Sequence, residues 1–189
     1  FIRIIGSCLV VSLIIEGFLA ATLSAYLQCQ LGSTIAIAGM IIGCASAAGA
    51  VQSLRWAWNP VLSPMIGRIS DSSSHRGRLF AICCWGAALL FGASALRMSL
   101  VPLLFLMLGI ELVSTALTTL ADALAADLAS GTQTVLVITA YTFASDVGAA
   151  LGPMGGYAFI NLLGVHAAYA AAAALLAIMA LGWSLHRHN

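Results

Sequence analysis

The stretch Gly148-Ala-Ala-Leu-Gly-Pro-Met-Gly-Gly156 lies inside a long apolar run and indicates the class of fold. Gly148, Gly152 and Gly156 recur every four residues, so on a helix they form one ridge without side chains. Such a ridge lets a neighbouring backbone approach closely, which is typical of helices packed in a membrane. Pro153 removes one backbone donor beside the ridge, and a membrane helix tolerates this when neighbouring groups satisfy the freed carbonyl. The stretch therefore predicts a glycine-packed membrane helix.

The composition of the whole chain is that of an integral membrane protein. Of its 189 residues, 62% are apolar and 7% are charged, and the mean hydropathy is +1.07. A water-soluble domain of this size with that composition would aggregate. The net charge of +1 and the lack of a basic patch exclude a nucleic acid partner. The five cysteines lie in or beside apolar runs without metal-ligand spacing, so we expect no metal and no other cofactor.

The apolar runs predict an all-α bundle of six membrane spans, since a bilayer requires about 20 residues per span. The second run is longer than a membrane needs, so it either tilts beyond the bilayer or breaks between Trp56 and Pro60. If the spans are divided three plus three, the second and fifth match in being long and interrupted by glycine and proline, which is typical of an inverted repeat. We expect one bundle over residues 1–189, with spans at about 4–27, 33–69, 79–96, 100–120, 135–163 and 167–185.

The distribution of arginine predicts the orientation of the bundle. An even number of spans places both termini on one side of the membrane. Of the arginines outside the spans, Arg97 alone lies on the opposite side, and the positive-inside rule then predicts cytoplasmic termini for a multi-pass protein of the cell membrane. The arginines expected on the cytoplasmic side are Arg3, Arg68, Arg76, Arg78 and Arg187.

The glycine-rich stretch also carries a resemblance to a known family. Its pattern, Gly148-x-x-x-Gly152-Pro153-x-x-Gly155-Gly156, resembles the antiporter motif on the fifth helix of export carriers in the major facilitator superfamily. The resemblance implies that these five residues pack and gate two helices. Ordinary glycine packing between membrane helices is the alternative interpretation.

A second resemblance to the same superfamily lies in the predicted cytoplasmic loop after the second span, at Gly67, Asp71, Arg76, Gly77 and Arg78. The sequence departs from the family pattern, because Gly77 comes six residues after Asp71 rather than three, and Ser72 stands where an arginine is usual. The aspartate is expected to cap a helix or to pair with a loop arginine, holding two helices in one of two arrangements. A positive-inside loop closed by a turn is the alternative.

The resemblance implies one six-helix half of a twelve-helix carrier. Glu111 lies roughly where the amino-terminal half of such carriers has an arginine, and Asn189 follows the last span directly. Both features favour the carboxy-terminal half, whereas the antiporter motif is best known from the amino-terminal half. The chain, which begins at Phe1, is accordingly expected to be a fragment whose partner half is missing.

Four ionisable side chains lie inside predicted spans and are the candidates for chemistry: Glu16, Arg55, Glu111 and Asp146. Placing such a group at mid-bilayer costs at least ~2.5 kcal/mol, so each should face a cavity, find a partner or act in the function. Low-dielectric surroundings favour the neutral form of a carboxyl group, so such a group can load and release a proton near neutral pH. The alternative for each carboxylate is a structural ion pair, most simply with Arg55.

Neighbouring polar residues place two of these carboxylates on polar stripes. Thr115, Thr118 and Asp122 share a helix face with Glu111, and Thr139 and Thr142 share one with Asp146. The two stripes predict one shared aqueous path. On the first span, Ser12 lies one turn before Glu16.

The family resemblance implies secondary active transport by alternating access around a central site. A small organic solute or drug would be exported in exchange for protons, with the four ionisable residues binding proton or substrate. The expected partners are the lipid bilayer, the substrate, protons and the other six-helix half. An intramembrane protease of the rhomboid type is one alternative, but Gly92-Ala-Ser-Ala lacks the second glycine of the required Gly-x-Ser-Gly pattern and His166 lies at a span edge. A non-transporting scaffold or sensor is another, although it would not need polar stripes. We expect no enzymatic activity.

Overall fold

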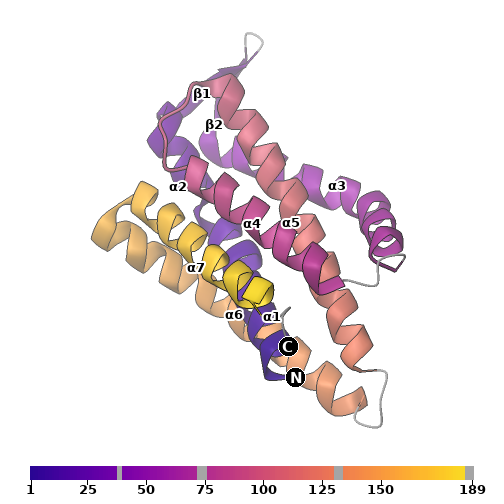
Figure 1. The fold of residues 1–189 in the computed structure, drawn as a ribbon. Coiled ribbons are helices and arrows are strands. Elements are labelled where there is room, and N and C mark those ends of the chain that lie inside the picture. The colour runs from indigo at the N-terminus through magenta and orange to yellow at the C-terminus, as the bar shows by residue number, and fades with distance from the viewer. Residues whose placement is uncertain (38–39, 72–75, 130–133, 186–189) are drawn as a thin grey trace.

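The computed structural model describes residues 1–37, 40–71, 76–129 and 134–185, and helices dominate it (Figure 1). The first span consists of three consecutive helical segments, namely α1 (Ile2–Ser12), the π-helix η1 (Leu13–Leu19) and α2 (Ala20–Leu31). The remaining elements are β1 (Thr34–Ile37), β2 (Met40–Gly43), α3 (Cys44–Asp71), α4 (Arg76–Ala93), α5 (Leu100–Leu128), α6 (Thr134–Leu163) and α7 (Val165–Leu185).

Within the described residues, five helical segments are long and apolar enough to cross a membrane: Ile2–Leu31, α4, α5, α6 and α7. They confirm the prediction of a polytopic helical membrane protein. Helix α3 has 28 residues, but Gln52, Arg55 and Asn59 make its middle polar, and it is not among the five. The sixth span and the three-plus-three repeat stay predictions.

A β-hairpin joins the first span to α3, so the expected helix from residue 33 onward was wrong. Gly32 ends α2 with a φ of +88°, a conformation that glycine adopts without steric cost. The strands β1 and β2 then pair antiparallel, with Thr34 opposite Gly43. Five of the eight strand residues are β-branched, and such residues favour extended backbone over helix. Helix α3 starts only at Cys44, whose Sγ donates a hydrogen bond to the Gly32 carbonyl at 2.9 Å.

The predicted alternative of a break between Trp56 and Pro60 was also wrong. Helix α3 continues to Asp71 with Pro60 and Pro64 inside it. Each proline removes one backbone donor and therefore one hydrogen bond within the helix. The hairpin, and not a break, accounts for the excess length of the second apolar run.

A buried aromatic cluster closes the bundle where the first span ends. The ring of Tyr169 lies 4.9 Å from Phe18, 4.5 Å from Tyr26 and 5.9 Å from Phe91, measured between centroids. Tyr26 Oη donates to the Ser94 carbonyl at 2.9 Å, which satisfies its polar end in an apolar core. Three spans are thus joined around one side chain of α7.

Helix α1 begins and α7 ends at the same end of the bundle (Figure 1). The Trp183 side chain connects these two ends, because its Nε1 donates to Ser7 Oγ at 2.8 Å. The ring also packs edge-on against Phe80 of α4 at 5.1 Å. Whether this end faces the cytoplasm stays a prediction.

Candidate functional site

The glycine ridge of α6 packs directly against the first span. A Cβ added at Gly152 would lie 2.5 Å from the Cα of Gly17, and one at Gly148 would lie 2.5 Å from the Leu9 carbonyl oxygen. A Cβ added at Gly156 would lie 2.7 Å from the Phe18 ring. These distances are too short for a methyl group without movement of a neighbour. Gly148 and Gly152 therefore allow contact between two backbones, and Gly156 leaves room for the Phe18 ring. The motif residues Pro153 and Gly155 lie outside this contact, and the gating role of the motif stays a prediction.

The ridge meets the end of α1 at Gly148 and the π-helix η1 at Gly152 and Gly156. Gly17 belongs to η1 and is buried against α6, whereas its neighbour Glu16 is exposed. π-helical turns are rare and are frequent at functional sites. The sequence analysis missed both the π-helix and the role of Gly17 as the partner of Gly152.

Glu16 borders a small cavity of about 50 Å³ between the first span, α5 and α6, which we call the Glu16 cavity. Asp122 lines the same cavity and accepts a hydrogen bond from Tyr141 Oη at 2.5 Å. Asp122 was predicted to share a helix face with Glu111, and in the structure it lies on the Glu16 cavity. The lining residues are Cys8, Val11, Ser12, Glu16, Thr118, Ala121, Asp122, Tyr141 and Ser145.

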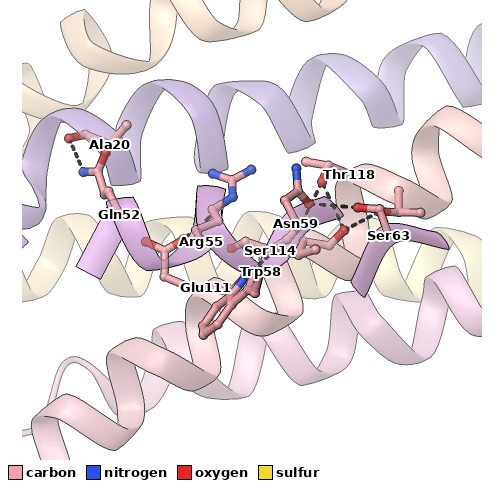
Figure 2. Close-up of polar contacts among 11 residues, drawn as sticks. Ala20, Gln52, Arg55, Trp58, Asn59, Ser63, Glu111, Ser114 and Thr118 are labelled. Atoms are coloured by element: carbon pink, nitrogen blue, oxygen red, sulfur yellow. Dashed lines mark hydrogen bonds and ion pairs between the residues drawn. The ribbon is translucent and has the colours of Figure 1, made fainter. Parts of the chain in front are cut away.

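Three polar contacts join α3 and α5 along their length, and we call them the α3–α5 seam (Figure 2). Arg55 Nε lies 3.8 Å from Glu111 Oε2, whereas the end of the Arg55 guanidinium extends away from the carboxylate (Figure 2). The two further contacts are Trp58 Nε1 donating to Thr115 Oγ1 at 3.3 Å and Thr119 Oγ1 bonding Ser63 Oγ at 3.0 Å. Residue numbers rise together on both helices, so α3 and α5 run parallel along the seam.

Glu111 is the most buried charged group of the seam, with 1% of the residue exposed. Its Oε2 accepts no hydrogen bond from any described residue, which leaves Arg55 at 3.8 Å as its partner. A buried carboxylate needs both a counter-charge and hydrogen bonds to offset the loss of water. The Glu111 site therefore holds a carboxyl group that is only partly satisfied.

The structure brings together two of the four predicted candidates, Arg55 and Glu111. Glu16 lies apart from them, on its own cavity. Asp146 is exposed on α6 together with Thr139 and Thr142, because the buried face of α6 is the glycine ridge. The two predicted stripes do not form one path inside this bundle: that of α5 faces α3 and the Glu16 cavity, whereas that of α6 faces outward.

A further set of site residues could have been found from helical spacing alone. Gln52, Arg55, Asn59 and Ser63 recur at three- and four-residue intervals, which places them on one face of a helix. Gln52 Nε2 donates to the Ala20 carbonyl at 2.9 Å and joins α3 to the first span (Figure 2). No spacing in the sequence predicts the contact of Tyr141 with Asp122, because that contact depends on how α6 packs against α5.

The loop motif forms a charged bridge at the ends of three helices. Arg76, at the start of α4, pairs with Asp71 at the end of α3 and with Asp127 at the end of α5. The motif glycines differ in their surroundings: a Cβ at Gly67 would meet no described atom within 4 Å, whereas one at Gly77 would lie 2.9 Å from the Trp183 ring. The inserted loop residues 72–75 lie outside the described residues, so the expected pair of arrangements stays a prediction.

Arg76→Ala is expected to change stability little, although it removes both ion pairs. The side chains of Asp71 and Asp127 are 66% and 55% exposed, and water screens such pairs. Ion pairs of this kind contribute about 0–1 kcal/mol each. Thermal unfolding in detergent should give a midpoint within a few degrees of wild type, as should the neighbouring variant Arg78→Ala. A failure of Arg76→Ala alone to fold would show that the bridge is structural.

No family model and no curated protein matches this chain. The resemblance to the major facilitator superfamily therefore stays a prediction from the two sequence motifs.

Proposed function

We propose that this chain is one six-helix half of a secondary active transporter that exports a small organic solute in exchange for protons. The observation that carries the proposal is the buried Arg55–Glu111 pair between α3 and the apolar helix α5. Burying an ion pair is usually no more stabilising than apolar packing. Ionisable groups at membrane depth mark substrate pathways and proton relays. A pair this buried and this incompletely satisfied is better explained by function than by stability.

The chemistry of Glu111 fits proton exchange. Its carboxyl group can be neutralised by Arg55, by a proton, or by a cationic substrate group that displaces either. When a substrate cation binds beside a protonated Glu111, the proton leaves and the carboxylate keeps a counter-charge. When a proton from the opposite side of the membrane binds the carboxylate again, Glu111 becomes neutral and the substrate cation leaves, which completes the exchange. While neither proton nor substrate is bound, Arg55 supplies the counter-charge. The exchange needs only small movements of α3 relative to α5.

Two other features support alternating access under this proposal. At Gly152, η1 and α6 meet backbone to backbone, so no side chain blocks a shift of these segments against each other at that point. The Arg76 bridge joins the ends of three helices through exposed pairs that cost little to break. In a twelve-helix carrier of the cell membrane with cytoplasmic termini, a partner half would cover the exposed Asp146 stripe of α6.

Proton release on adding a lipophilic phosphonium cation tests this function. Protein purified from its native membrane in weakly buffered detergent should acidify the solution when the cation binds. Glu111→Gln should abolish the release, because an amide cannot exchange a proton in this way, while Asp146→Asn should retain it. Glu16→Gln shows whether the Glu16 cavity takes part.

Release from Glu111→Gln at the level of wild type would remove Glu111 from the coupling site. If the cation binds to wild type and releases no protons, coupling to protons fails. Binding can be followed separately by equilibrium dialysis of the labelled cation, so that the two results are distinguished.

A further inference from the structure

A shallow groove follows the outside of the bundle between the first span and α7. A hollow of about 310 Å³ occupies the end near the chain termini, with Arg3 and Val10 on one side and Leu175 and Trp183 on the other. A second hollow of about 250 Å³ continues it toward the α6–α7 turn, and Leu175 lines both hollows. Its lining includes Leu13, Phe18, Ala168 and Ala171.

The dimensions of the groove fit a single hydrocarbon chain. Fifteen residues separate Arg3 from Phe18, which is about 22 Å along a helix and somewhat more than one bilayer leaflet of about 15 Å. Side chains are missing where the groove is most open: a Cβ added at Gly6 or Gly182 would meet no described atom within 4 Å. Below its mouth the groove is lined almost entirely by apolar side chains and glycine.

The mouth of the groove is positively charged. The Arg3 guanidinium lies 3.8 Å above the centroid of the Trp183 ring. Arg78 lines a neighbouring hollow that also borders Trp183, together with Trp85. Neither arginine forms an ion pair with any carboxylate in the part of the chain that the structure describes. A stacked guanidinium keeps its N–H groups free to bind phosphate oxygens, and tryptophan is enriched at the depth of lipid headgroups.

We propose that an anionic phospholipid occupies this groove, with its phosphate at Arg3 and one acyl chain between the first span and α7. Basic pockets between membrane helices are known binding sites for anionic headgroups. The arginine at the mouth and the apolar lining below it match a charged headgroup with an acyl chain better than they match an apolar helix of a second copy. The headgroup site involves none of the residues of the α3–α5 seam, although the second hollow also borders Gly152, Gly155 and Gly156 of α6.

Native mass spectrometry of delipidated protein tests the headgroup site, with dioleoyl phosphatidylglycerol and dioleoyl phosphatidylcholine as the probes. Two arginines predict about a 30-fold preference of the wild type for phosphatidylglycerol. Arg3→Gln should lower this preference about fivefold, and Arg3→Gln with Arg78→Gln should remove it. Arg97→Gln, at the opposite end of the bundle, is the matched control and should keep the full preference. Equal binding of the two lipids by wild type, or an unchanged preference in the double variant, would overturn the proposal.

Filling the groove tests the acyl-chain site separately. Gly182→Leu and Gly6→Leu should each weaken the binding of both lipids, since a leucine would occupy the space of the chain. Gly49→Leu is the control, because Gly49 has equally open surroundings but lies on α3. Undiminished lipid binding in both groove variants would contradict the proposal. So would a dimer mass that only these variants lose, since it would show that a second copy fills the groove.

Discussion

Gly152→Ala is expected to prevent the first span and α6 from packing at their present distance. The added methyl group would meet the carbonyl of Leu13, the Cα of Gly17 and the amide of Phe18, all of which are backbone atoms. Backbone atoms cannot rotate out of the way, so the helices must separate. Overpacking usually costs about 1–3 kcal/mol, and we expect the upper end of this range or more. Thermal unfolding in detergent, followed with a thiol-reactive dye that reports the buried Cys8 and Cys84, measures the loss.

Gly155→Ala is the matched control on the same helix, three residues away. A Cβ at Gly155 would meet no described atom within 4 Å, and alanine is the better helix former by about 1 kcal/mol. This variant should therefore be at least as stable as wild type. Equal destabilisation of both variants would show that flexibility of the α6 backbone, and not the contact with Gly17, is what the glycines provide.

Arg55→Met should be nearly as harmful, because it leaves the Glu111 carboxylate buried without a counter-charge. Removing one partner of a buried ion pair typically costs about 3–5 kcal/mol. The value expected here is at the lower end of this range, since the Arg55 side chain is 13% exposed and the pair is separated by 3.8 Å. The yield of monodisperse protein on size exclusion and the unfolding midpoint in detergent both measure the effect.

Arg55→Met combined with Glu111→Gln should recover most of the lost stability, because the second change removes the unpaired charge and keeps the shape. The same double variant should not exchange protons. Arg68→Met, at an exposed position on the same helix, controls for the general effect of replacing an arginine in α3 and should be close to wild type. A double variant no more stable than Arg55→Met would mean that Arg55 stabilises the fold by other contacts.

Hydropathy predicted the positions of most helices well, but it could not separate helix from hairpin in the second run. The expected spans at 79–96 and 100–120 correspond to α4 and α5, and those at 135–163 and 167–185 to α6 and α7. The hydropathy of the run from residue 33 is compatible with a helix and with a strand, so hydropathy alone could not decide between them. Its β-branched residues and the preceding Gly32 were the signals for the hairpin.

The site was only partly readable from the sequence. Helical spacing placed Glu111 and Thr115 on one face of α5, and Arg55 was the simplest candidate partner for a buried carboxylate. Spacing within one helix carries no information on which other helix lies opposite, so the contacts of Gly152 with Gly17 and of Asp122 with Tyr141 required the packed bundle. The exposed position of Asp146 likewise follows from which face of α6 the glycine ridge occupies.

The π-helix in the first span also fixes how the residues before it are rotated about the helix axis relative to the residues after it. Before η1, Ser12 bonds Ser145 of α6 at 2.8 Å; after it, Thr22 bonds the hydroxyl of Tyr169 in α7 at 3.4 Å. A π-helical turn holds more residues than an α-helical one, because its hydrogen bonds join residues i and i+5. Deleting one residue from Leu13–Leu19 would rotate one face by about 100° relative to the other. The number of residues in η1 is therefore as strongly constrained as their identity. An insertion or deletion there would break the contact of Ser12 with Ser145 or that of Thr22 with Tyr169, whereas a substitution within η1 would leave both in place.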